Sequence, residues 1–137
     1  MTEQSAGPGA DLPVVLELDR EECLRLLATA AVGRVVYTTA ALPAVHPVAF
    51  RLRGRDILFR TDSGAVLAGV PGAVVGFQAD DVDPTSWTGW SVVAVGEARW
   101  VAAHEQAASV FPSAGAEVGE QALCIRAQRL TGWARRL

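Results

Sequence analysis

The strongest constraint on the fold is a pair of alternating runs joined by Gly54-Arg55. The first run covers residues 44–53 and the second covers residues 56–61, and apolar side chains recur at every second position in both. This alternation predicts two strands that each bury one face. A glycine in the first position of a two-residue connection suits a type II′ turn. We therefore expect an antiparallel hairpin in which Ala49, Arg51 and Arg53 point to the side opposite Val48, Phe50 and Leu52. Which of the two sides faces the ligand stays open for Arg51 and Arg53.

Polar groups collect directly after the second run. Ser63 can cap a short helix that begins with residues 64–66. A helix start offers unpaired backbone N–H groups and a partial positive charge, and Arg60 and Thr61 precede it closely. Together these groups predict a phosphate-binding site. On spacing alone, an ordinary hairpin with a solvated arginine and a capped helix is the commoner arrangement.

The first run also has features that suit a flat ligand. Pro47 has no backbone N–H to donate, and Ala49 keeps the outer face thin. A planar ring can therefore approach the backbone there. His46 is the best candidate for acid–base chemistry, because it precedes the proline on an extended segment. A lone histidine on a strand is more often structural or simply exposed.

Three segments carry a resemblance to a known family. They are Pro47-Val48 followed by Arg60-Thr61 and Gly64, the segment 89–93 leading to Gly96, and two C-terminal strands with Arg126 and Thr131-Gly132. In this order and spacing they resemble the pyridoxamine 5′-phosphate oxidase-like family of FMN-binding split β-barrels, from about Leu18 to the end of the chain. The resemblance implies a mainly β fold, an antiparallel closed or split barrel with short helices. It also implies FMN as cofactor, a homodimer with two flavin sites at its interface, and hydride transfer to or from a small-molecule substrate.

The resemblance assigns the cofactor contacts residue by residue. They comprise a segment along the isoalloxazine ring, a phosphate-binding group and one aromatic residue near the ring from either subunit: His46, Pro47, Val48, Ala49; Arg60, Thr61, Ser63, Gly64, Val66; Trp90. For Trp90, core packing is an equally good interpretation.

Val66 departs from the family pattern, because many relatives carry a lysine there. The chain contains no lysine; all 12 basic residues are arginine. Two alternatives therefore stay open: a reductase that uses the deazaflavin F420 on the same fold, and a non-catalytic flavin, haem or small-ligand binding protein. The absence of lysine also excludes a Schiff-base enzyme and a P-loop.

Length and composition favour one globular domain over residues 13–137, with a flexible tail over residues 1–12. The net charge of −3 and pI near 5.3 argue against a nucleic-acid binder. We expect no membrane span, no signal peptide and a cytoplasmic location, with Cys23 and Cys124 as reduced core residues. The two histidines and two cysteines do not form a metal signature, and the acidic segment 80–83 is expected to be a solvated turn.

The remaining elements follow from periodicity and helix-end signals. A helix capped by Asp19 is expected to end at Gly33, with Leu24, Leu27, Ala28 and Ala31 buried and a Glu21–Arg25 pair. We expect further strands over residues 34–39, 73–79, 87–101, 122–127 and 129–135, and a helix over 102–111. The strand 73–79 is nearly all apolar and is expected to be buried on both faces. Gly96 is expected to bend the long strand, as barrel closure requires.

Overall fold

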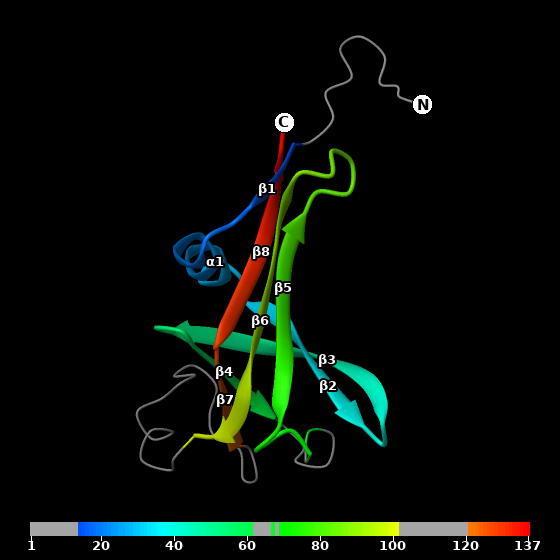
Figure 1. Cartoon of the computed structure of the whole chain (residues 1–137), viewed down its shortest axis with the longest axis vertical. Helices are drawn as coiled ribbons and strands as arrows, with labels where there is room; N and C mark the ends of the chain where they lie inside the picture. The colour runs from blue at the N-terminus through cyan, green and yellow to red at the C-terminus, as the bar shows by residue number, and fades with distance from the viewer. Residues whose placement is uncertain (1–13, 62–66, 68, 102–120) are drawn as a thin grey trace.

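The computed structural model describes residues 14–61, 67, 69–101 and 121–137 (Figure 1). It contains one helix and eight strands within these ranges: β1 (Val14–Glu17), α1 (Arg20–Leu27), β2 (Val32–Thr39), β3 (Leu42–Arg53), β4 (Asp56–Thr61), β5 (Val74–Val82), β6 (Gly89–Trp100), β7 (Gln121–Arg126) and β8 (Arg129–Arg136). The predicted tail at 1–12, the short helix starting at 64–66 and the helix at 102–111 lie outside the described residues.

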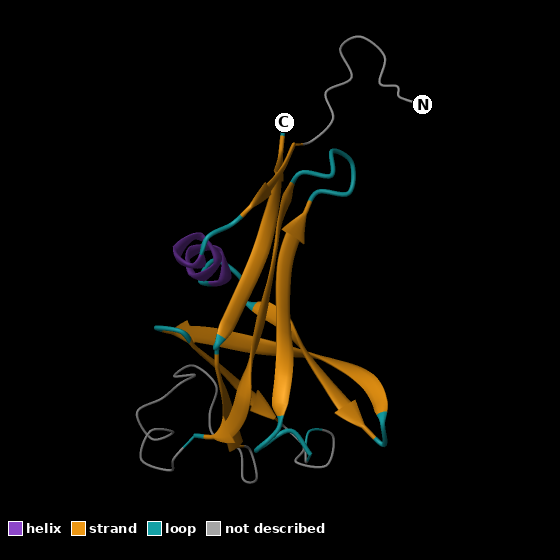
Figure 2. Ribbon diagram, viewed as in Figure 1, coloured by secondary structure: helices purple, strands orange, loops and turns teal. Residues whose placement is uncertain are grey.

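Six antiparallel strands form a closed barrel in the order β6-β5-β2-β3-β4-β7, because β7 pairs with both β4 and β6. Beyond the barrel, β8 pairs with the other edge of β6, and β1 pairs with β8. In the view of Figures 1 and 2, β5, β6 and β8 run along the long axis and β3 crosses them, with α1 beside β8. The predicted mainly β, antiparallel barrel is confirmed.

The central hairpin forms as predicted. Arg53 pairs with Asp56, which leaves Gly54-Arg55 as the two-residue turn, and Gly54 has a φ of 64°. A positive φ at this position suits glycine and the type II′ turn. Val48 and Phe50 are 7% and 4% exposed, so the apolar face of β3 points into the barrel.

The helix begins as predicted but ends earlier. Asp19 Oδ1 accepts a hydrogen bond from the backbone N–H of Glu22 at 2.8 Å, which makes it the N-cap. Arg25 pairs with Glu22 at 2.6 Å rather than with the predicted Glu21. The buried residues of α1 are Cys23 and Leu27, whereas Leu24 is half-buried and Ala28 and Ala31, outside the helix, are exposed.

The prediction that Gly33 ends this helix was wrong. Gly33 lies inside β2, where a Cβ atom would fall 2.2 Å from Cζ of Phe77. The glycine is therefore needed because the Phe77 ring packs on the β2 backbone. A glycine that makes room for a neighbour and a glycine that ends a helix look the same in one sequence.

The strand β5 differs from the prediction that both of its faces are buried. Its residues alternate between buried and exposed: Phe77 is fully buried, whereas Val74 is 68% exposed. β6 changes its partner from β8 to β7 just beyond Gly96, whose Cβ would lie 1.9 Å from the carbonyl oxygen of Arg126. Gly96 therefore permits a close backbone approach where the barrel closes. The acidic segment also differs from the prediction, since Asp80 and Asp81 lie in β5.

The core fills the barrel and continues under α1, with Leu27, Phe59 and Phe77 fully buried. Both cysteines are buried and free, as predicted, and burial is the main cause that raises the pKa of each thiol. They are therefore packing residues. Among the described residues, no helix is long and apolar enough to cross a membrane.

Candidate functional site

The candidate site is the outer face of the β3–β4 hairpin. Along β3, the exposed residues Pro47, Ala49 and Arg51 alternate with buried ones. Arg51 pairs with Leu58 of β4, and Arg60 lies two residues further along β4, so it shares this face. The structure therefore brings together a flat surface, made by a proline and an alanine, and two guanidinium groups.

The strand that carries this face also carries residues that point the other way. His46 pairs with the fully buried Val35, and Val48 is 7% exposed, so both belong to the inward-facing set of β3. His46 is half-buried near the end of that set. The structure thus separates His46 and Val48 from Pro47 and Ala49, because neighbouring residues of a strand point to opposite faces.

The predicted phosphate group is described only in part. Thr61 is the last residue of β4 and pairs with Gln121 of β7, so its backbone is held at the end of the hairpin face. The remaining predicted members of this group, Ser63, Gly64 and Val66, lie outside the described residues.

A salt bridge fixes the other end of the hairpin. Asp56 is 8% exposed and accepts a hydrogen bond from Nε of Arg126 on β7 at 3.0 Å. This hydrogen bond and the carboxylate charge raise the pKa of Arg126. The bridge ties β4 to β7 and neutralises the acidic group of the hairpin. Arg51, Arg53 and Arg60 belong to the same outer face.

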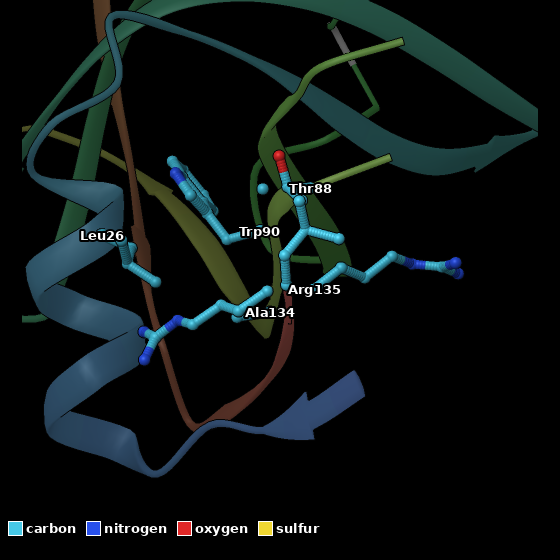
Figure 3. A pocket seen from close by; sticks show the side chains of 8 residues that line it. Leu26, Thr88, Trp90, Ala134 and Arg135 are labelled. Atoms are coloured by element: carbon cyan, nitrogen blue, oxygen red, sulfur yellow. The ribbon is translucent and has the colours of Figure 1, made fainter. Parts of the chain in front are cut away.

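Trp90 lies elsewhere. It is 8% exposed and packs in the core on the inner side of β6, where it lines a pocket with Leu26 and Ala134 (Figure 3). It stands eight residues before Ala98, where β6 begins to pair with β7, a distance of about 27 Å along the strand. Within one chain, Trp90 is therefore not a neighbour of Arg60.

Sequence reasoning missed a polar network beside the hairpin. Gln78 accepts a hydrogen bond from Nη1 of Arg34 at 3.1 Å and donates from Nε2 to Ser91 Oγ at 3.2 Å and to Asp80 at 2.9 Å. Arg34 pairs with Pro47 in the β2–β3 register, so the network adjoins the flat face. Its four members are spread over three strands, and only the pairing of β2, β5 and β6 brings them together.

Exposed valines surround this network on the outer surface of β2, β3 and β6. They are Val32, Val36, Val45 and Val93, which are 56%, 38%, 60% and 38% exposed. We call these four residues the valine patch. The signal in the sequence was the outward position of Val32 and Val36 in an alternating strand, but alternation alone does not say whether an outward face meets solvent or a partner.

The hairpin face can hold a planar ring with an anionic substituent. Pro47 and Ala49 offer a thin surface for the ring, and the two guanidinium groups can pair with a phosphate. The outward set formed by Pro47, Ala49, Arg51 and Arg60 contains no histidine, thiol or carboxylate. The face is therefore suited to binding and orienting a reactive group.

Comparison with known proteins identifies relatives of this chain. A sequence model of the pyridoxamine 5′-phosphate oxidase family matches residues 19–128. The uncharacterized protein Rv0080 of Mycobacterium tuberculosis is 49% identical over 100 residues, which are 69% of this chain and 66% of that protein. This chain therefore covers slightly less than two thirds of that relative.

Two solved structures share the fold. The FAD binding protein of Mycobacterium smegmatis is 30% identical with a TM-score of 0.71, over 90% of this chain and 100% of the other. A FAD-binding protein of Mesorhizobium loti is 18% identical with a TM-score of 0.75, over 91% of this chain and 99% of the other. At 18% identity, the likeness to the Mesorhizobium loti protein concerns the fold alone.

Proposed function

Because the chain belongs to the pyridoxamine 5′-phosphate oxidase family, we propose that it is a flavin-binding protein that uses FMN to pass a hydride to or from a small molecule. One observation carries the proposal: Pro47 and Ala49 form a thin outward face that shares its side of the hairpin with Arg51 and Arg60. The solved relative that is 30% identical binds a flavin, which supports the same class of cofactor.

The residues of the face fit such a cofactor. The isoalloxazine ring would lie along β3 against Pro47 and Ala49, where few side-chain atoms intervene. Its phosphate would meet Arg60, with Thr61 at the end of β4 beside it. Arg51 supplies a second positive charge on the same side, which compensates for the lysine that is missing at Val66.

The flavin supplies the redox chemistry when bound, and the protein holds and orients it. The β3 backbone would limit access to one side of the ring, and Arg60 and Arg51 would bind its anionic tail. His46 belongs to the inward set of β3, so it is a weak candidate for a catalytic acid or base. We assign no catalytic side chain to the hairpin face.

We further propose that the protein acts as a homodimer. The valine patch supports this, because exposed apolar side chains gathered on one surface together with hydrogen-bonding groups are typical of a protein interface. A partner on this surface would adjoin Pro47 through Arg34 and so cover the flavin edge. Sedimentation velocity at several protein concentrations tests the oligomeric state directly, and a monomer throughout the range contradicts the dimer.

FAD is a second candidate, favoured by the name of the 30% identical relative. FAD carries an extra nucleotide beyond the phosphate that both flavins present to Arg60. The F420 alternative requires basic groups along a longer anionic tail. A carrier or sensor without turnover would share the binding face and differ only in lacking an acceptor.

The deciding experiment is a visible absorption spectrum of the purified protein followed by titration with FMN, FAD and F420. We expect saturable FMN binding, and we expect Arg60→Ala to weaken it about 10- to 150-fold, because a charge-assisted contact contributes about 1.5–3 kcal/mol. Arg20→Ala, at an exposed position of α1, is the matched control and should bind FMN as the parent does. Equal affinity of both variants would refute the role of Arg60.

Two other outcomes distinguish the alternatives. Preference for F420 over both flavins would move the protein to the deazaflavin class. Tight flavin binding without oxidation of NADH or NADPH in the presence of an electron acceptor would favour the carrier.

A further inference from the structure

The pocket that Trp90 lines lies between α1 and the ends of β6 and β8 (Figure 3). Its volume is about 380 Å³, within the range of pockets that take small molecules. Six of its lining residues bear on the chemistry: Leu26, Thr88, Trp90, Ala134, Arg135 and Arg136. The pocket opens on the inner side of β6 and β8, whereas Pro47 and Ala49 belong to the outer surface, so it is separate from the hairpin face.

The floor of the pocket is apolar and rigid. Trp90 and Ala134 pair with each other across β6 and β8, and they are only 8% and 2% exposed. Leu26 projects from α1 toward the same space (Figure 3). An indole, a leucine and an alanine offer contact to a flat apolar group, and an aromatic ring can stack on or meet the edge of Trp90.

Two arginines line the rim of the pocket. They are Arg135 and Arg136, and none of the side chains that line the pocket among the described residues is acidic. Figure 3 shows the Arg135 side chain extending away from Trp90, so it does not fill the pocket. Its guanidinium carbon lies 4.8 Å from the centroid of the Trp133 ring and 6.0 Å from that of Trp87.

These contacts hold the Arg135 charge in a partly dehydrated position. Cation–π contacts with the two indoles restrict the guanidinium, and its Nε atom is buried with no hydrogen-bond partner among the described residues. The contacts direct the Arg135 guanidinium toward Trp133, on the opposite side of β8 from Ala134, so Arg136 is the arginine that can meet an anion in the pocket. Trp87 has a φ of 60°, a rare conformation for a bulky residue, and it is 59% exposed.

We propose that this pocket is a second binding site, for a small aromatic carboxylate. The ring would lie on Trp90 between Leu26 and Ala134, and the carboxylate would meet Arg136 at the rim. The size of the pocket and its apolar floor favour one or two fused rings over a nucleotide. The site does not depend on the flavin assignment, since it shares no residue with the hairpin face.

The test is a titration of the full chain with 2-naphthoate, with 2-naphthamide as the neutral probe of the same shape. Binding is followed through the indole N–H signals of the four tryptophans in NMR spectra, with the Trp90 signal assigned from Trp90→Phe. We expect 2-naphthoate to shift the Trp90 signal saturably and to bind at least about ten-fold more tightly than 2-naphthamide.

Arg136→Gln should reduce the affinity for 2-naphthoate about ten-fold and leave that for 2-naphthamide unchanged. Arg136 is exposed, so the variant is expected to fold. Arg129→Gln, at an exposed position near the other end of β8, is the matched control and should bind both probes as the parent does.

Three results would overturn the proposal: equal affinity for the charged and neutral probes, no effect of Arg136→Gln, or displacement of 2-naphthoate by FMN. The last would place the probe in the flavin site. FMN binding by the same samples is measured in parallel, so failure of the second site is distinguishable from failure of the flavin assignment.

Discussion

The packing of Phe77 on Gly33 makes a sharp prediction about stability. In Gly33→Ala, the new Cβ would lie 2.2 Å from Cζ and 2.7 Å from Cε2 of Phe77. The Phe77 ring is fully buried and meets Phe50 edge to face at 4.8 Å, so it has no free space into which to turn. The ring or the β2 backbone must shift, and overpacking of this kind costs about 1–3 kcal/mol.

Gly76→Ala is the matched control on the neighbouring strand. Its Cβ would meet Cβ of Val36 at 3.5 Å, an ordinary contact. Replacing a glycine in a strand by alanine removes backbone freedom from the unfolded chain and stabilises by about 0.5–1 kcal/mol. The two variants add the same methyl group, and we expect their free energies of unfolding to differ by at least about 1.5 kcal/mol.

The assay is urea unfolding followed by tryptophan fluorescence, at one protein concentration for all three proteins because dimerisation would add to apparent stability. The slope of the free energy against urea should be the same in all three. Equal stability of Gly33→Ala and Gly76→Ala would refute the reasoning, because it would mean that the Phe77 ring is free to move.

Two further predictions concern the β2–β3 turn and a buried thiol. Ala40 and Ala41 have φ values of 51° and 64°, which are left-handed and strained for alanine. Ala41→Gly should relieve this strain and raise the free energy of unfolding by about 0.5–1 kcal/mol in the same urea assay. A lower free energy of unfolding would show that the turn is unstrained. Burial raises the pKa of the Cys124 thiol above the ordinary value of 9.0. As the pH rises above 9.0, the thiol therefore ionises in the unfolded chain before it ionises in the folded one, and the free energy of unfolding falls. Cys124→Val should show a shallower fall in urea titrations across this range, and an identical fall would exclude a contribution from the thiol.

The sequence predicted the local elements well because their signals are local. Alternation defined both strands of the central hairpin, and Gly54 identified its turn. The same alternation put Arg51 and Arg53 on one side of the first strand, and the structure decided that this side faces outward. β1 was missed, because four residues whose side chains are all exposed leave little pattern.

The site was predictable to the extent that it lies on one hairpin. Pro47, Ala49 and Arg60 were named from the sequence and do share a face. His46 and Val48 were named with them because they are adjacent in the chain, but adjacent residues of a strand point apart. Trp90 was placed near the ring by resemblance, and within one chain it belongs to the pocket under α1.

What the sequence determined by itself was therefore a set of strands, their buried faces and the family to which they belong. These depend on periods of two residues and on turn chemistry, which act over a few positions. Tertiary structure alone decided that β7 closes the barrel onto β6, that Gly33 makes room for Phe77, and that Arg135 lies against two indoles. Each of these joins residues far apart in the chain, and a contact of that kind depends on which strands pair, which local periodicity does not specify.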